Sequence, residues 1–369
     1  MLTRIYINNF RSLVNFELKF DRINLLMGSN GSGKTSVFEV LRRIQLFLDG
    51  DIRIQSAFPY RDLTRWQSSP DQHFELSLDV QNQKYKYILT IQHAEEGRKC
   101  RVSQESLLYN DHILFESKMG EAQLYRDDFS NGPKYPFDWT LSGVGTLQAR
   151  NDNTYLTRFR QEISKFVVAG ISPSQMDAES RSEDPRLASR MENFVSWYRK
   201  LSQENMEYIS ILFEALKKVL PGFRSFKLKD VGGDSKALQV LFDAPEKSNK
   251  PIAFDFNELS DGQRALIALY TLIYGFGSEG LTLFLDEPDN YVALREIQPW
   301  LSTLRDECGE RFEQAILISH HPEIINYLGD SKGRWFERAN GPTRVLDVPP
   351  VSVEGLTLSE TIARGWNEN

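Results

Sequence analysis

The segment GSNGSGKT, residues 28–35, constrains the fold more than any other part of this sequence. The residues before it, INLLM at 23–27, predict a short buried strand. After it, apolar residues recur at helical spacing until Gly50, where we expect the helix to end: Val37, Phe38, Leu41, Ile44 and Leu48. A strand, a glycine loop and a helix in this order indicate an α/β fold with a phosphate-binding loop.

The residue types in this loop suit phosphate chemistry. Gly28, Gly31 and Gly33 allow the backbone to turn closely, so that successive N–H groups face an anion at a helix N-terminus. We expect Lys34 to reach the terminal phosphates of a nucleotide and the Thr35 hydroxyl to bind Mg²⁺. The remaining residues expected to contact the phosphates are Ser29, Asn30, Ser32 and Ser36.

Two carboxylates follow a second apolar strand, Leu281 to Leu285. Such a strand suits the centre of a parallel sheet, and ligands bind at the carboxyl ends of its strands. We expect Asp286 to hold Mg²⁺ through water and Glu287 to orient and polarise an attacking water molecule. The next apolar strand ends in ISHH, residues 318–321. There we expect His320 to contact the terminal phosphate and stabilise developing charge, and His321 to have no catalytic role.

A second glycine turn, LSDGQ, occupies residues 259–263. Ser260 can cap the helix that follows, and Gly262 leaves the first N–H groups of that helix open to an anion. With Gln263, these residues form a second expected phosphate contact. Because the turn has no lysine or metal ligand of its own, we expect it to complete a nucleotide site whose other half is supplied elsewhere.

The rest of the chain suggests three parts: an N-terminal lobe at 1–150, a helical insertion at 151–221 and a C-terminal lobe at 222–369. Residues from Phe74 to about 127 alternate with period two and predict an antiparallel meander. Segment 171–186 is polar and contains two prolines, so we expect a mobile loop, and residues 334–347 predict a closing hairpin around Asn340-Gly341. The insertion has three apolar stripes and no sustained heptads, which argues against a long coiled coil. The stripes are Leu156, Phe159, Ile163 and Phe166; Met191, Phe194, Trp197 and Leu201; and Tyr208, Ile211, Leu212, Leu216 and Val219.

Composition limits the compartment and the class of partner. The net charge of −7 argues against a surface built for non-specific nucleic-acid binding. Cys100 and Cys308 lack the spacing of a metal site or a disulfide framework, which favours a reduced, cytoplasmic location. The N-terminus has no apolar signal core, and the longest apolar stretch is too short to span a bilayer, so we expect no membrane association.

The set GSNGSGKT, LSDGQ, FLDEP and ISHH, in this order, resembles the ATP-binding cassette (ABC) ATPases. The resemblance implies ATP and Mg²⁺ as ligands. It also implies a homodimer in which two heads enclose two ATP molecules and each LSDGQ turn contacts the partner's nucleotide. The segments IYINNFRSL and LSETIARGW are similar to the RecF/SMC/Rad50 and OLD-like branch, closest to stand-alone ATPases labelled AAA_21 or AAA15. The expected fold is therefore an α/β P-loop ATPase head with an antiparallel meander and a helical insertion.

Two positions depart from the family pattern or leave it open. The family often continues after the glutamate with E-x-x-L-H-P, whereas this chain has DNYVAL at 289–294, with Ala293 in place of the histidine. A glutamine that binds the metal is also expected, and Gln67 is preferred as this ligand over Gln72.

We expect an ATP-hydrolysing switch that controls a separately encoded effector, such as a nuclease, in bacterial anti-phage defence. The alternative is a RecF/Rad50-like DNA-binding ATPase in DNA repair, which makes DNA a second candidate partner. The long insertion argues against a transporter subunit, and too few residues follow ISHH for a nuclease domain, so we expect no nuclease activity in this chain. We expect the candidate DNA contacts to be solvated surface charges: Arg42, Arg43, Arg61 and Arg65.

Overall fold

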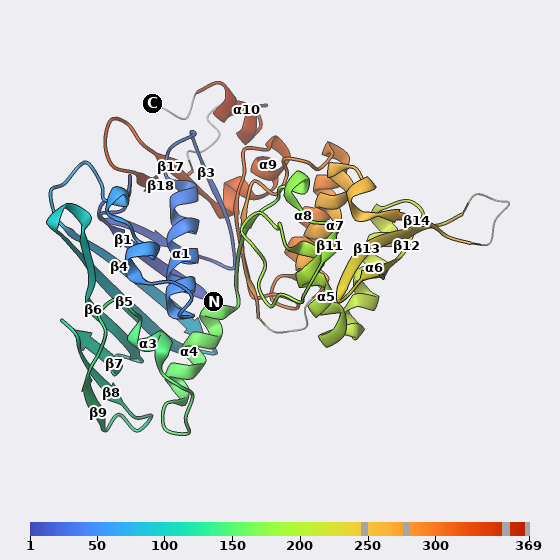
Figure 1. Cartoon of the computed structure of the whole chain (residues 1–369). Helices are drawn as coiled ribbons and strands as arrows, with labels where there is room; N and C mark the ends of the chain where they lie inside the picture. Colours follow the sequence, from blue (N-terminus) through green and yellow to red (C-terminus); the bar gives the residue numbers. More distant parts are fainter. Residues whose placement is uncertain (245–249, 276–279, 349–354, 366–369) are drawn as a thin grey trace. The chain divides into compact units, whose positions relative to one another are not determined.

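The computed structural model describes residues 1–244, 250–275, 280–348 and 355–365. The chain forms two compact units (Figure 1). The first comprises Met1–Phe166 with Lys332–Pro349, and the second comprises Val167–Ser331 with Pro350–Asn369. These boundaries do not coincide with the expected divisions after residues 150 and 221.

The first unit is built around an eight-stranded sheet in which all neighbouring strands are antiparallel (Figure 1). Side chains of its strand at 71–80 alternate between buried and half-buried positions, which is the period of two that predicted the meander. The meander is confirmed, and it extends beyond residue 127 by one strand. In spatial order the strands are β2 (Phe16–Lys19), β1 (Leu2–Asn8), β4 (Asp71–Val80), β5 (Gln83–Ala94), β6 (Lys99–Tyr109), β7 (His112–Lys118), β8 (Glu121–Tyr125) and β9 (Asn131–Pro136).

The first unit has three further strands, which pair with one another, and one of them leads into the glycine loop. β3 (Ile23–Gly28) is buried along its whole length and pairs in parallel with β17 (Gly333–Glu337). β17 pairs in turn with the antiparallel β18 (Arg344–Leu346), which confirms the closing hairpin. Asn340 in its loop has a φ of 53°, a left-handed conformation that asparagine tolerates better than most residues.

The first unit contains four helices and two 3₁₀ turns among its described residues. α1 begins immediately after Gly33 and ends two residues before Gly50, whose φ of +79° confirms the expected stop. The Gln45 side chain of α1 donates to the carbonyl oxygens of Ile163 and Phe166, at 2.9 and 2.8 Å, and so ties this helix to the end of α4. The elements are α1 (Lys34–Leu48), α2 (Ile54–Ala57), η1 (Tyr60–Asp62), η2 (Glu95–Gly97), α3 (Gly143–Thr146) and α4 (Thr154–Ser164).

The prediction that Phe166 continues a helical stripe is wrong. α4 ends at Ser164, and Phe166 is the first residue of β10 (Phe166–Gly170). Its segment, FVVAG, contains two adjacent valines, which favour extended backbone. A short apolar run does not distinguish helix from strand by its spacing alone, so neighbouring structure decides.

In the second unit, β10 neighbours β15 (Thr282–Asp286), which pairs in parallel with β16 (Gln314–Ile318). A separate antiparallel sheet has β13 (Ser235–Phe242) at its centre, bonded to β11 (Glu179–Ser180), β12 (Phe223–Gly232) and β14 (Ile252–Asp255). The 3₁₀ turn η4 (Phe256–Glu258) follows β14. The helices are α5 (Phe194–Glu204), α6 (Met206–Val219), α7 (Asp261–Tyr274), α8 (Leu294–Glu307), α9 (Pro322–Lys332) and α10 (Leu358–Ala363).

Segment 171–186 is more ordered than the predicted mobile loop. It contains the 3₁₀ turn η3 (Pro173–Gln175) and strand β11, which pairs with β13. Ser180 of β11 is fully buried. The hydrogen bonds come from a strand more than fifty residues further along the chain, so local composition could not predict them.

Among the described residues, the longest helix is α1, with 15 residues. None of the described helices combines the length and the apolar character that are needed to cross a membrane. The predicted closing segment LSETIARGW is described up to Gly365, and its Trp366 lies outside the described residues.

Candidate functional site

The glycine loop between β3 and α1 is closely packed on one side and open on the other. A Cβ on Gly28, whose φ is +136°, would lie 2.1 Å from the Phe336 carbonyl oxygen of β17. A Cβ on Gly33, whose φ is +102°, would lie 2.7 Å from the Thr343 hydroxyl oxygen. A Cβ on Gly31, whose φ is +77°, would meet nothing within 4 Å. The loop therefore requires glycine by backbone conformation at all three positions, and Gly31 marks its open side.

The Lys34 side chain bonds to the backbone of this loop. Its side chain is buried, and Nζ donates to the carbonyl oxygens of Gly28 (2.7 Å) and Ser29 (3.0 Å). Gly33 is the N-cap of α1 and brings no side chain to cap the first turn of the helix. A helix N-terminus without such a cap, beside a lysine ammonium group, is the arrangement that binds phosphate oxygens. The loop therefore fits a nucleotide phosphate chain.

The closing hairpin supports the loop through residues that the sequence did not single out. Thr343 is buried, and its hydroxyl lies 2.7 Å from the Ser32 carbonyl oxygen and 2.8 Å from Ser12 Oγ. Arg338 donates to the Gly31 carbonyl oxygen (3.2 Å). The hairpin itself was predictable, but its contact with a loop some three hundred residues earlier had no sequence signal.

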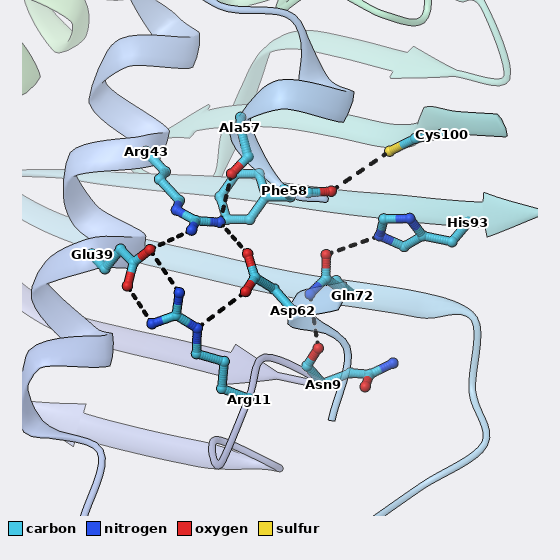
Figure 2. Close-up of polar contacts among 10 residues, drawn as sticks. All are labelled: Asn9, Arg11, Glu39, Arg43, Ala57, Phe58, Asp62, Gln72, His93 and Cys100. Carbon is cyan, nitrogen blue, oxygen red and sulfur yellow. Dashed lines mark hydrogen bonds and ion pairs between the residues drawn. The ribbon is translucent and has the colours of Figure 1, made fainter. Parts of the chain in front are cut away.

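An ion-pair network joins Glu39 and Arg43 of α1 to Arg11 and Asp62 (Figure 2). Arg43 donates to Asp62 Oδ2 (2.6 Å) and pairs with Glu39, and its guanidinium lies over the Phe10 ring at 5.3 Å. Arg11 donates to Asp62 Oδ1 (3.1 Å) and also pairs with Glu39. The prediction that Arg43 is a solvated surface charge is therefore wrong, because carboxylates from two segments enclose it.

The structure distinguishes the two candidate glutamines. Gln72 is fully buried; its amide donates to the Asn9 carbonyl oxygen (2.9 Å), and its Oε1 lies 3.0 Å from His93 Nε2 (Figure 2). Both ends of the Gln72 amide are therefore engaged inside the fold. Gln67 is half-buried, with one contact of 3.4 Å from its Nε2 to Asn8 Oδ1. This difference in engagement favours Gln67 as the candidate metal ligand.

The two adjacent carboxylates of the second unit lie where β15 ends. Asp286 is the last residue of β15, and Glu287 has a φ of 48°, which is strained for a residue with a side chain. The Glu287 N–H donates to the Ile318 carbonyl oxygen of β16 (2.8 Å), and its carboxylate accepts from Asn290 Nδ2 (2.7 Å). Backbone strain held by such contacts concentrates at functional sites. The geometry therefore fixes Glu287 at the carboxyl end of a parallel strand pair.

A buried carboxyl group that the sequence did not single out lies close by. Burial raises the pKa of Asp289, a change that a hydrogen bond with the Ser319 side chain opposes. Among the described residues, Asp289 Oδ1 has no hydrogen-bond partner. Ser319 Oγ also accepts from the His321 N–H (2.9 Å). The spacing of Asp289, two residues after Glu287, was the available sequence signal for it.

The two histidines of ISHH differ in their surroundings. His320 is exposed. His321 is half-buried, and its Nδ1 accepts from the Glu323 N–H (3.2 Å) in the first turn of α9. His321 therefore has a contact with the start of α9, and His320 is the histidine that lies open to solvent.

The LSDGQ turn begins α7, and Ser260 caps this helix as its sequence predicted. Ser260 Oγ accepts from the Gln263 N–H (3.3 Å), and Gln263 Oε1 accepts from the Ser260 N–H (3.0 Å). A Cβ on Gly262 would lie 3.0 Å from the Tyr291 carbonyl oxygen, so the turn packs against the loop after Glu287. Arg264 donates to the Pro173 carbonyl oxygen (2.6 Å) of η3. The start of α7 is thus linked both to the acidic loop and to segment 171–186.

The predicted site residues therefore fall into two groups. The glycine loop, Lys34, Thr35 and Gln67 lie in the first unit, together with the closing hairpin. The acidic pair, His320 and the LSDGQ turn lie in the second.

Comparisons with known proteins agree on one class. The sequence model of the AAA_21 family, described as "AAA domain, putative AbiEii toxin, Type IV TA system", matches residues 23–326. The DNA replication and repair protein RecF of Histophilus somni is 32% identical over 97 residues, which are 26% of this chain and 25% of that protein. The chain thus spans about a quarter of the length of the curated RecF relatives it matches.

Two solved structures share the fold. The crystal structure of an SMC head bound to the C-terminal winged-helix domain of ScpA superposes with a TM-score of 0.56 at 12% identity, covering 94% of this chain and 97% of that one. The SMC head domain from Thermotoga maritima gives 0.50 at 15% identity, covering 94% and 99%. At these identities the likeness concerns the fold. The chain belongs to the AAA_21 family, and its fold is that of an ABC-type ATPase head of the RecF/SMC branch.

Proposed function

We propose that this chain binds ATP with Mg²⁺ and hydrolyses it to ADP and phosphate. The observation that carries the proposal is the geometry of the glycine loop. The closing hairpin bonds to the loop at Ser32, Lys34 bonds to its Gly28 carbonyl oxygen, and the space next to Gly31 is open. Residues 28–36 would hold the phosphate chain, and Thr35, Asp286 and Gln67 would hold the metal. When bound, Mg²⁺ neutralises charge on phosphate oxygens and so favours attack on phosphorus.

In this proposal, Glu287 orients and polarises the attacking water. Its backbone is fixed by the bond to Ile318, and its carboxylate is held by Asn290, so the group has little freedom to turn away. His320, exposed at the end of the next strand, would stabilise charge near the terminal phosphate.

We also propose that two copies of the chain share two composite sites. The LSDGQ turn has an anion-binding helix start but no lysine, and Ser260, Gly262 and Gln263 would contact the nucleotide held by the partner's glycine loop. The family relationship to ABC-type ATPases supports this arrangement.

The proposed role is an ATP-dependent switch in the cytoplasm that controls a separately encoded effector such as a nuclease, in anti-phage defence. The description of the family, which refers to a toxin–antitoxin system, supports this role. A DNA-binding ATPase in repair is the second candidate, which the matches to RecF, a DNA replication and repair protein, favour. In both cases this chain supplies the switch and not the nuclease.

Segment 171–186 is the proposed docking surface for the effector. Arg264 at the start of α7 donates to Pro173, so movement of the LSDGQ helix would reach this segment directly. Because Ser180 is buried in β11, a charge reversal at its exposed neighbours, Glu179→Lys with Arg181→Glu, tests docking without removing the strand. We expect wild-type ATPase with loss of effector capture; loss of ATPase with capture retained would contradict this proposal.

The ATPase proposal is tested by two substitutions. Lys34→Ala should abolish ATP binding, because the loop loses its lysine. Glu287→Gln should bind ATP, hydrolyse it at least about a hundredfold more slowly and accumulate as dimers, since general-base catalysis contributes roughly 10²–10⁴-fold. Glu310→Gln, at an exposed position in the second unit, is the control. If light scattering detects no ATP-dependent dimer of Glu287→Gln, the shared-site arrangement is wrong.

Sharing of sites is tested by mixing variants. Ser260→Arg should abolish turnover but retain nucleotide affinity, because its own glycine loop is intact. In heterodimers with Lys34→Ala, both defects fall in one composite site and the other site is whole, so partial ATPase activity should return. Loss of ATP binding in Ser260→Arg alone would instead assign the turn to the chain's own nucleotide.

A further inference from the structure

The first unit contains a cavity of about 560 Å³ whose lining shares only Gln67 with the residues of the proposed ATP site. It lies between segment 60–70 and the end of β5, and its lining includes Tyr60, Arg61, Arg65, Gln67, Ser69 and His93. This volume lies within the range of about 300–1,000 Å³ that is typical of small-molecule sites.

Buried polar residues fix the wall of this cavity. Asn9 donates to the Ser69 carbonyl oxygen (2.7 Å) and accepts from the Thr64 N–H (3.0 Å). The backbone N–H of His93 donates to the Pro70 carbonyl oxygen (3.0 Å), and the His93 ring bonds with Gln72 (Figure 2). Segment 60–70 is therefore pinned at several backbone positions, so the cavity is largely formed before any ligand binds.

The cavity carries positive charge on a chain whose net charge is −7. Arg61 and Arg65 are both exposed, and within the described part of the chain neither has an ion-pair partner. Arg11 and Arg43 are in contrast both paired with carboxylates. Glu95, the acidic residue of the lining, is paired with Lys99. Two guanidinium groups that are free to form forked hydrogen bonds indicate a phosphate or carboxylate ligand.

An aromatic ring forms another part of the lining. Tyr60 is 46% exposed, and its ring lies edge-on to His93 at 5.9 Å. Its Cβ packs against Gly97, where an added Cβ would lie 2.4 Å away. The ring is thus held from one side and remains partly exposed on the other. Because bases commonly stack on aromatic side chains, the exposed part of the ring could pack against a planar ligand.

We propose that this cavity binds a nucleoside phosphate, with the phosphate held by Arg61 and Arg65 and the base packed on Tyr60. The site differs from the ATP site because it has no glycine loop and shares only Gln67 with it. Gln67 also belongs to its lining, so a bound ligand contacts the segment that carries the proposed metal-binding glutamine. That link to ATP turnover rests on the proposed function; the binding itself does not.

Calorimetric titration with thymidine 5′-monophosphate tests the proposal. The Lys34→Ala background prevents binding at the glycine loop, and thymidine and inorganic phosphate serve as partial ligands. We expect one site per chain, with binding weakened roughly tenfold or more by Arg61→Ala with Arg65→Ala, since two charge-assisted contacts are lost. The control is Arg126→Ala with Arg150→Ala, two exposed arginines of the same unit outside the cavity, and it should leave affinity unchanged.

Two further variants separate the parts of the site. Arg61→Lys with Arg65→Lys should retain part of the affinity, because the charge is kept while the forked geometry is lost. Tyr60→Leu should weaken binding of the monophosphate but not of inorganic phosphate. Thermal melts confirm that the exposed positions leave the fold intact. No binding at millimolar monophosphate, or equal binding by the Arg61→Ala, Arg65→Ala protein, overturns the proposal.

A short oligothymidylate distinguishes the two sources of this ligand. Tighter binding of the oligomer than of the monophosphate identifies a nucleotide unit within a single strand, whereas equal or weaker binding identifies a free nucleotide. Because heat of binding is measured without hydrolysis, a failed ATPase assay does not affect this result.

Discussion

Replacing Asp62 by asparagine should destabilise the first unit measurably. Asp62 is 4% exposed, and its two carboxylate oxygens accept from Arg11 (3.1 Å) and Arg43 (2.6 Å). The asparagine side chain would have no charge and would turn an N–H₂ donor toward a guanidinium. Breaking a buried pair by removing one partner costs about 3–5 kcal/mol. Arg11 is partly exposed and Glu39 still pairs with both arginines, so we expect about 2–3 kcal/mol here.

Urea unfolding of the full chain measures this change. The matched control is Asp138→Asn, which breaks the exposed pair with Arg53 and should change the free energy of unfolding by less than about 0.5 kcal/mol. Amide hydrogen exchange should in addition become faster at residues 58–70 in Asp62→Asn, because the Asp62 carboxylate ties this segment to Arg11 and to Arg43 of α1. A loss below about 1 kcal/mol, with unchanged exchange, would refute the view that this network holds the segment against α1.

Other predictions concern the glycine loop and acid stability. Gly28→Ala should prevent folding of the loop, seen as insoluble or ATP-binding-deficient protein, because its Cβ would lie 2.1 Å from the Phe336 carbonyl oxygen; a soluble variant with wild-type ATP affinity would contradict this. Thr343→Val should cost about 1–3 kcal/mol in urea unfolding and weaken ATP binding, because loss of the buried hydroxyl removes a hydrogen-bond partner from the Ser32 carbonyl oxygen and from Ser12 Oγ; unchanged affinity would contradict the supporting role. Burial by itself would raise the pKa of Glu75. Hydrogen bonds and charge from Arg4, His73 and Lys86 outweigh this effect and lower the pKa to about 2. This stabilisation is fully present above pH 4.5 and is lost toward pH 2. Glu75→Gln lacks this titrating group, so its free energy of unfolding should fall less than that of the wild type between pH 4.5 and pH 2. Because solvent screens part of these interactions, we expect a difference of about 1–2 kcal/mol, and identical pH profiles of the two proteins would contradict the prediction.

The sequence by itself determined the features that depend on near neighbours. The strand, glycine loop and α1 follow one another within about thirty residues, and positive φ at three glycines explains why those residue types are required. The alternation along β4 and the cap of α7 by Ser260 are equally local, since each depends on residues two or three positions apart. These signals were sufficient for the family and for the candidate phosphate, metal and water-activating residues.

The tertiary structure decided the features whose partners lie far apart in the chain. Phe166 became a strand residue, and 179–180 became part of a sheet, because distant strands supplied the hydrogen bonds. Arg43 forms an ion pair inside the unit because the fold brings Asp62 next to it. Thr343 bonds to Ser32 although more than three hundred residues separate them in the chain. Periodicity and spacing record which residue types a segment contains, whereas the partner that satisfies a buried charge or a backbone N–H is selected only when the chain folds.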